Sequence, residues 1–202
     1  MSDTRVDVNR RRITQAALAE FSRDPDVSMD QIAKAAGVVR RTVYGHFPSR
    51  EALVSTLVDD AIESIGRALI EGSTGIAEPD AALVGAVFAV WPIADRYRLL
   101  ISMAEYHVSI DGLAERLAPV RAVCEALIRN GKEAGLFTSP VPTEVLAYSH
   151  EHIMLGLLAA VDAGALPPEN GARYAATTAL LAVGAPPERI HEILESHDVP
   201  SP

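Results

Sequence analysis

The sequence predicts an all-α protein with a short N-terminal helix-turn-helix region and a larger helical region after it. Apolar residues recur at intervals of three and four along most of the chain, which is the period of an amphipathic α-helix. No segment alternates apolar and polar residues over the length of a strand with turn residues at both ends. Segments rich in glycine and proline interrupt the pattern and mark the ends of the expected helices.

Composition and charge are uneven along this chain. The 202 residues are 49% hydrophobic, which suffices for a sizeable core. The net charge is −9, yet residues 1–50 hold nine Lys and Arg against six Asp and Glu, a net of +3. Residues 51–202 hold nine against twenty-one, a net of −12. This asymmetry favours a basic module that attracts a polyanion, although ordinary scatter of surface charge is the alternative.

No segment predicts export or membrane insertion. The longest uncharged runs, 81–94 and 174–187, have fourteen residues each, fewer than the roughly 18 that a spanning helix needs. The N-terminus lacks the apolar core of a signal peptide, and the single cysteine cannot form an internal disulfide. We therefore expect a cytoplasmic protein.

Three short helices are expected in the first fifty residues, over 9–22, 28–36 and 40–47. Ser28 and Gln31 have the spacing of a capping box, and Gly37 suits the positive φ that ends a helix. Two short helices joined by a three-residue turn form a helix-turn-helix, whose second helix enters the DNA major groove in DNA-binding proteins. Many proteins that bind no DNA share this geometry.

The third helix has one apolar face and one polar face. Val43 and Phe47 are four residues apart, so they can pin the helix to its neighbour. The other face gathers basic and polar residues and a glycine that permits close approach to DNA; it comprises Arg40, Arg41, Thr42, Tyr44, Gly45 and His46. Arginine is the commonest bidentate partner of guanine, and hydroxyl groups bind phosphate oxygens. A plain surface helix with a chance arginine pair is the alternative.

Residues 29–54, "MDQIAKAAGVVRRTVYGHFPSREALV", resemble the DNA-binding signature of the TetR family of bacterial transcriptional regulators. The matching positions are Ile32, Ala33, Ala36, Gly37, Val38, Thr42, Val43, Tyr44, Phe47, Ser49, Arg50, Glu51 and Leu53. With the upstream helix, the resemblance covers about residues 9–58. It implies double-stranded DNA with a palindromic operator as a partner, a homodimer, and a variable C-terminal domain that binds a ligand.

The resemblance also implies roles for single residues. Phosphate contacts fall mainly on Thr42, Tyr44, His46 and Arg50, and base contacts fall on Arg40 and Arg41. The basic run Arg10–Arg12 adds phosphate contacts or is a solvated helix end. Two positions depart from the family pattern. Val39 replaces the usual small polar residue and cannot cap the third helix. Arg41 stands where the family often has glycine or proline, which predicts a different operator.

The rest of the chain is expected to be helical, with a regulatory and dimerisation domain over 51–202 after a DNA-binding domain over 1–50. The helices are expected at about 50–70, 80–91, 93–109, 112–134, 142–164, 169–184 and 186–197. Pro92 separates two of them, and Pro119 marks a kink or a late start in another. The segment 71–80 is expected to be a loop.

The last two long helices are expected to pair across a two-fold axis, as the resemblance implies. Small residues that let helix axes approach closely mark the expected interface, and these are Gly156, Ala160, Ala163, Ala172, Ala175, Ala176, Ala179 and Val183. A helix buried within a single monomer is the alternative. The ligand pocket is expected among the middle helices, with the candidates Phe88, Trp91, Met103, Tyr106, His107 and Cys124. Each of these could instead belong to the core.

No catalytic, metal or cofactor site is expected. His150 and His152 are two residues apart on a helix, so they point to nearly opposite sides and cannot share an ion. No phosphate loop, nucleophile elbow or pair of catalytic carboxylates is present in the sequence. We therefore expect a ligand-responsive DNA-binding regulator, a repressor, whose ligand is a small, largely apolar or aromatic molecule. The alternative is a DNA-binding protein without an inducer, whose C-terminal domain docks a protein partner.

Overall fold

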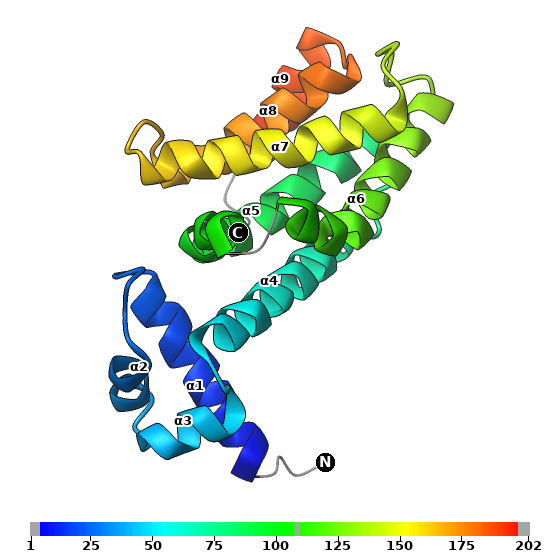
Figure 1. The fold of residues 1–202 in the computed structure, drawn as a ribbon. Coiled ribbons are helices and arrows are strands. Elements are labelled where there is room, and N and C mark those ends of the chain that lie inside the picture. The colour runs from blue at the N-terminus through cyan, green and yellow to red at the C-terminus, as the bar shows by residue number, and fades with distance from the viewer. Residues whose placement is uncertain (1–4, 108–109, 198–202) are drawn as a thin grey trace. The chain divides into compact units, whose positions relative to one another are not determined.

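The computed structural model of this chain is helical throughout the residues that it describes (Figure 1). It describes residues 5–107 and 110–197, and side-chain surroundings for 7–100 and 112–197. Within these ranges there is no β-strand, which confirms the predicted all-α class. The elements are α1 (Arg5–Phe21), α2 (Met29–Ala35), α3 (Arg40–His46), α4 (Arg50–Ser73), α5 (Pro79–His107), α6 (Ile110–Glu133), α7 (Thr143–Asp162), the 3₁₀ helix η1 (Pro168–Asn170), α8 (Gly171–Val183) and α9 (Pro187–His197).

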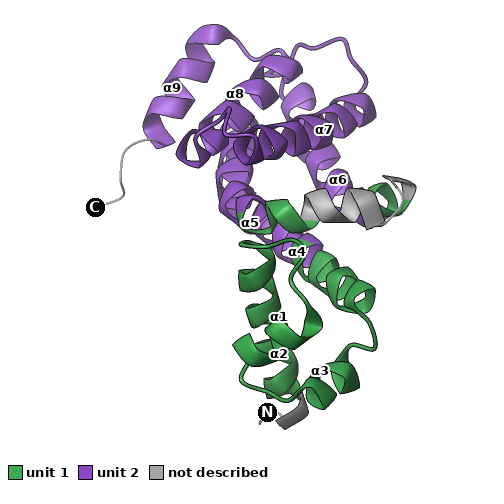
Figure 2. Ribbon diagram, turned by 60° about the vertical axis from the view of Figure 1, so that its left-hand side comes forward, with its two compact units in different colours: residues 1–61, 96–115 green, residues 62–95, 116–202 purple. Residues whose placement is uncertain are grey.

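The chain forms two compact units (Figure 2). The first contains residues 1–61 and 96–115, and the second contains residues 62–95 and 116–202. Helices α4, α5 and α6 each contribute to both units, so the division does not follow helix ends. The domain boundary that we predict at residue 50 falls at the first residue of α4 and stays a prediction.

The core of the first unit lies among α1, α2, α3 and the start of α4. Helix α1 buries one face, and α2 packs against both α1 and α3. The side chains with almost no exposed surface are Ile13, Ala17, Phe21, Ile32, Val43, Phe47 and Leu53. Burying large apolar side chains in this way stabilises a fold by about 1.5–3 kcal/mol each.

The ends of α2 are set by two local devices. The Gln31 amide N–H donates to Ser28 Oγ at 3.3 Å, and Gln31 Oε1 accepts from the Ser28 amide at 2.9 Å, so the capping box forms. At the other end Gly37 has φ +63°, and a Cβ there would lie 2.9 Å from Arg12 Nη2. At the start of α3, Val39 supplies no side-chain cap, as its side chain predicts.

One expected helix break is wrong. Helix α5 continues through Pro92 instead of dividing there, and Pro119 likewise lies inside α6. A proline removes a single amide donor and bends the helix; surrounding packing can hold the two halves together. The buried neighbours Val90, Trp91 and Ala94 supply that packing on the second-unit part of α5.

The second unit is built around α8, which packs against α7, α9 and η1. Arg189 of α9 joins the N-terminal end of α5 by donating from Nε to Asp80 Oδ2 at 2.8 Å. Asp80 is only 1% exposed, and its Oδ1 accepts the Ala81 amide at 2.8 Å. Burial alone would raise the pKa of Asp80, but these hydrogen bonds hold that pKa below its ordinary value. This buried ion pair therefore ties the C-terminal helix to α5.

Two pairs of helices in the second unit approach so closely that only glycine fits between them. A Cβ on Gly72 of α4 would lie 2.6 Å from Ala89 Cβ and from the Gly85 carbonyl oxygen of α5. A Cβ on Gly171 would overlap the ring of Trp91, whose Nε1 donates to the Pro168 carbonyl at 3.0 Å.

Among the described residues, no helix is both long enough and apolar enough to cross a lipid bilayer.

Replacing Gly171 with alanine is expected to destabilise the protein by about 1–3 kcal/mol, because the added methyl group must displace the Trp91 ring. Chemical unfolding followed by circular dichroism measures this loss. The matched control is Gly66→Ala in α4, where the added carbon meets Val120 at an ordinary 3.9 Å. That change should stabilise the helix by up to about 1 kcal/mol. Equal effects of the two substitutions would contradict the packing described.

Candidate functional sites

Helices α2 and α3 form a helix-turn-helix whose second helix is held by two buried side chains. Val43 and Phe47 are almost fully buried, and the Phe47 amide donates to the Val43 carbonyl at 2.8 Å. Helix α3 has only seven residues and no side-chain cap, so burial rather than helix propensity holds it. This anchoring leaves its opposite face turned away from the core.

Arg41 is exposed on that opposite face. Among the described residues it has no hydrogen-bond or ion-pair partner. Tyr44 and Gly45 are exposed beside it, and a Cβ on Gly45 would meet nothing within 4 Å. Thr42 and His46 are half-buried at the edges of the face. The predicted contact residues of α3 are thus on one accessible surface, with a freely placed guanidinium at its start.

Arg40 is held in place, unlike Arg41. Its Nη1 donates to Asp30 Oδ2 of α2 at 2.5 Å, and its Nη2 lies 3.4 Å from the Tyr44 hydroxyl. The guanidinium carbon also lies 5.1 Å from the centre of the Tyr44 ring, within cation–π range. Asp30 is not among the residues predicted from the sequence, because an acidic residue is common in the first turn of any helix.

Two other arginines of the first unit lie over aromatic rings of its core. Arg50 donates to the Pro25 carbonyl and lies 5.1 Å from the centre of the Phe21 ring. Arg10 lies 5.0 Å from the centre of the Phe47 ring. These guanidinium groups are held at the surface by the first unit itself, so a phosphate contact by Arg50 has to use the N–H groups that remain.

The pocket candidates that the structure describes, Phe88, Trp91 and Cys124, have different surroundings. The Phe88 ring lies 5.3 Å from the His197 ring, and Trp91 is buried against Gly171. Cys124 lines a small cavity elsewhere in the second unit. Met103, Tyr106 and His107 fall outside the residues whose side chains the structure describes. Phe88 and Trp91 do not line that cavity, and the shared pocket stays a prediction.

The cavity beside Cys124 is enclosed by four helices of the second unit and is almost wholly apolar. Its free volume is about 10 Å³, room for about one water molecule. The lining residues are Leu83 of α5, Cys124 and Ile128 of α6, Leu146 and His150 of α7, and Ala179, Ala182 and Val183 of α8. Burial raises the pKa of the Cys124 thiol to about 12, so the thiol is neutral at physiological pH.

His150 is the polar feature of this cavity. Part of the residue touches solvent, yet its Nδ1 atom is inaccessible and is, among the described side chains, the buried nitrogen that lacks a hydrogen-bond partner. Burial lowers the pKa of His150 to about 4, so its imidazole is neutral at pH 7. The sequence analysis weighed His150 only as a metal ligand. Its spacing of four from Leu146 was the signal that it faces the interior.

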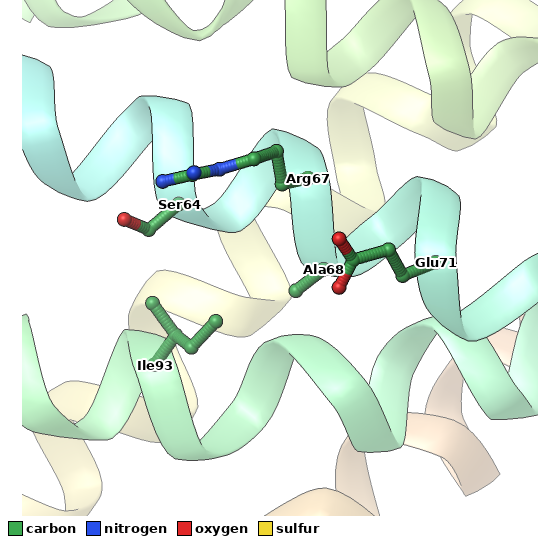
Figure 3. Close-up of a pocket in the computed structure, with 5 residues that line it drawn as sticks. All are labelled: Ser64, Arg67, Ala68, Glu71 and Ile93. Carbon is green, nitrogen blue, oxygen red and sulfur yellow. The ribbon is translucent and has the colours of Figure 1, made fainter. Parts of the chain in front are cut away.

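A second, open groove lies between α4 and α5 (Figure 3). Its volume is about 270 Å³, and Ile93 points from α5 toward α4. The other lining residues are Ser64, Arg67, Ala68 and Glu71 of α4. Arg67 is exposed and lies 4.0 Å from Glu63 one turn away. The exposed and charged lining of this groove suits solvent better than an apolar ligand.

No group of His, Cys, Asp and Glu suited to a metal ion occurs among the described residues.

Half of the predicted dimer interface belongs to the core of the single chain. Ala175, Ala176, Ala179 and Val183 are buried against the chain's own helices, so these positions leave no surface for a partner. Periodicity identified an apolar face of α8 but could not tell which neighbour covers it, and the interface as a whole stays a prediction. The other four positions, Gly156, Ala160, Ala163 and Ala172, are exposed or half-exposed.

Residues 13–57 match the family model described as bacterial regulatory proteins, tetR family. This segment of the chain therefore carries the TetR-family helix-turn-helix signature. This confirms the resemblance read from the helix-turn-helix.

Two relatives of this chain are themselves named as regulators. An uncharacterised HTH-type transcriptional regulator of Mycobacterium tuberculosis is 38% identical over 39% of this chain and 40% of its own length. The alignment thus spans well under half of that relative. The HTH-type transcriptional regulator EthR of Mycolicibacterium smegmatis is 28% identical over 76% of each chain. Both relatives carry the name of transcriptional regulators, in line with the expectation of a regulator rather than an enzyme.

The fold extends beyond the matched segment. The TetR-like transcriptional regulator LfrR from Mycobacterium smegmatis, solved in complex with proflavine, superposes with a TM-score of 0.70. The superposition covers 87% of this chain and 96% of LfrR at 19% identity. At that identity the likeness concerns the fold alone, and it extends well beyond residues 13–57.

Replacing His150 with leucine is expected to reduce the acid sensitivity of this protein. The pKa of about 4 in the folded state lies below the ordinary 6.5, so the unfolded state binds a proton first as the pH falls. His150 therefore costs the folded state up to about 3 kcal/mol between pH 6.5 and pH 4, and nothing above that window. Urea unfolding at a series of pH values measures this loss.

The exposed His191 of α9 provides the control for that measurement. His191→Gln should keep nearly the whole pH dependence of the original protein. If His150→Leu lost stability between pH 6.5 and pH 4 as steeply as the original chain does, the buried neutral state of His150 would be refuted.

Proposed function

We propose that this protein is a sequence-specific DNA-binding transcriptional regulator that responds to a ligand and represses transcription as a homodimer. The observation that carries the proposal is the exposed, unengaged Arg41 on a helix whose other face is anchored by Val43 and Phe47. In a helix-turn-helix, that combination presents a guanidinium to the base edges of the major groove. The net charge of +3 on residues 1–50 supports attraction to DNA there.

The proposed roles of the contact residues follow their surroundings. Arg40 and Arg41 read bases, and Thr42, Tyr44 and His46 contact phosphates from the edges of α3. Gly45 lets the backbone approach the DNA closely. Arg50 supports the phosphate contact from a guanidinium that Pro25 and Phe21 already orient.

The proposed dimer pairs the exposed faces of α7 and α8. The exposed positions of α7 include Val145, Tyr148 and Gly156, and those of α8 include Tyr174 and Leu181. Large apolar side chains on adjacent helices that pack on each other support a buried interface better than solvated surface. A two-fold dimer places two recognition helices on one palindromic operator.

The ligand response is supported by the relative with proflavine bound and by the apolar cavity of the second unit. A ligand that favours one spacing of the two recognition helices would shift the dimer between DNA-binding and DNA-free states. A coupling free energy of about 1–3 kcal/mol gives a 5–150-fold change in affinity. A small, largely apolar or aromatic molecule suits a cavity with these walls.

A second candidate function is favoured by the size of that cavity. At about 10 Å³ this cavity leaves little room for an inducer as it stands. A packed second unit suits a regulator whose C-terminal domain docks a protein partner instead of an inducer. Crystals soaked with a panel of small apolar molecules separate the two, because only an inducer-responsive protein would enlarge the cavity to admit one.

Fluorescence anisotropy with the intergenic DNA upstream of its own gene tests the proposed function. A scrambled duplex of equal length is the control, and both are titrated across a salt series. We expect a preference of about a thousandfold or more for the native duplex. Equal and steeply salt-dependent affinities would show phosphate attraction alone and would refute specific regulation from that site.

Replacing Arg41 with alanine is expected to relax the preference for one or two base pairs of the operator and to cost about 1–3 kcal/mol of binding free energy. Selection of binding sites from a random library measures the change at each position. Arg23→Ala is the matched control, because it removes one exposed positive charge from the same unit outside α3. A uniform loss of affinity on all sequences would argue against base reading by Arg41.

Replacing Asp30 with asparagine is expected to free Arg40 from its partner on α2. The freed cation should pair with a phosphate, so the slope of log affinity against log salt should steepen by about one unit. Discrimination at the base that Arg40 reads should fall at the same time. Asp26→Asn in the preceding loop removes the same charge away from α3 and should alter neither. Matching changes in both variants would show that Asp30 does not position Arg40.

A further inference from the structure

We propose that the cavity beside His150 is a ligand site that takes a small apolar molecule carrying one hydroxyl group, which hydrogen-bonds to His150 Nδ1. The inference rests on the proposed ligand-responsive function and names the site and the ligand class for it. The site lies wholly within the second unit, between α5, α6, α7 and α8. Phe88 and Trp91, the described candidates of the sequence analysis apart from Cys124, have no part in it.

His150 Nδ1 is a buried nitrogen without a hydrogen-bond partner among the described side chains. A buried polar atom without a partner costs about 1–3 kcal/mol, so proteins keep such atoms where something else satisfies them. The atom belongs to a side chain that lines the cavity, and the rest of the lining offers only the Cys124 thiol as a polar group. With the thiol proton retained, Cys124 behaves as a small hydrophobe. A ligand therefore has one polar anchor in this site and apolar walls elsewhere.

The protonation state of His150 selects a hydroxyl group. A neutral imidazole carries one N–H donor and one acceptor nitrogen, and either can be at Nδ1. A hydroxyl both donates and accepts, so it satisfies Nδ1 in both tautomers. A carboxylate or an ammonium group would carry a full charge into a space without a counter-charge among its lining residues, which costs far more. The chemical class is thus a neutral alcohol or phenol.

The small volume makes binding and helix movement inseparable. A molecule larger than water has to push apart Leu83, Ile128, Leu146 and Val183, which belong to four different helices. Helix α7 carries the cavity residues Leu146 and His150 on one side and the exposed Tyr148 and His152 on another. Movement of α7 on binding therefore reaches the face that we propose for the dimer.

The ion pair between α6 and α7 limits which way α7 can move. Arg121 donates from Nε and Nη2 to the two carboxylate oxygens of Glu151 at 2.8 and 3.0 Å. Both side chains are largely buried, and Arg121 lies 5.1 Å from the centre of the Tyr148 ring. This two-point contact stays beside the cavity when a ligand enters, so α7 is expected to turn about it instead of sliding along α6.

Phenol and toluene, which differ by a hydroxyl in place of a methyl group, test the site on the full-length protein. Histidine labelled with ¹⁵N reports the state of each ring nitrogen by NMR, and His150 is assigned by its loss in His150→Leu. We expect phenol to shift the His150 Nδ1 signal and to bind about tenfold more tightly than toluene, the factor that one net hydrogen bond supplies. His150→Gln should keep a preference for phenol, and His150→Leu should abolish it.

Two results would overturn the site. One is that phenol at millimolar concentration leaves the His150 signals unchanged, which would mean that a water molecule or nothing occupies the cavity. The other is equal affinity for phenol and toluene in the original chain. Operator binding without any ligand is measured separately by anisotropy. Loss of the phenol effect with intact operator binding refutes this site alone, whereas intact phenol binding without operator binding refutes the proposed function alone.

Discussion

The geometry of the candidate nucleic-acid interface depends on the burial of Val43 and Phe47. A seven-residue helix without a side-chain cap has too few internal hydrogen bonds to persist by itself in water. Its direction is therefore decided by the two apolar side chains that it inserts among α1, α2 and the start of α4. This contact therefore determines where the basic face of α3 lies. The capping box sets the start of α2 and Gly37 sets its end, so together they determine where the turn places α3.

The arginines of the first unit differ in how firmly the protein itself holds their guanidinium groups. Arg10 and Arg50 lie over core aromatic rings, and Arg12 lies against Gly37. Such arginines cover apolar surface with their stems and leave a positive edge toward solvent. Arg40 is oriented by Asp30, whereas Arg41 is unengaged. A modest net charge of +3 thus contains groups with very different freedom, which a charge count cannot reveal.

Particular elements show which features of the structure can be predicted from the sequence. The capping box of Ser28 and the uncapped start at Val39 follow from local spacing and side-chain chemistry, and the structure has both. The continuation of α5 through Pro92 could not be foreseen, because the packing that holds it comes from elsewhere in the fold. The same holds for Ala175, Ala176 and Ala179: periodicity shows that a face is buried, but not by which neighbour. The cavity at His150 needed four helices in place before it could be seen.

The burial of Cys124 has a practical consequence for work on this protein. It is the only cysteine of the chain, and its thiol holds its proton up to a pH of about 12. Thiolate, not thiol, reacts with maleimides, iodoacetamides and peroxide. At neutral pH the folded chain therefore behaves toward such reagents as though it had no cysteine. A single cysteine placed at an exposed position would be the one site that takes a fluorophore or a spin label, so distances between protomers become measurable without removing Cys124.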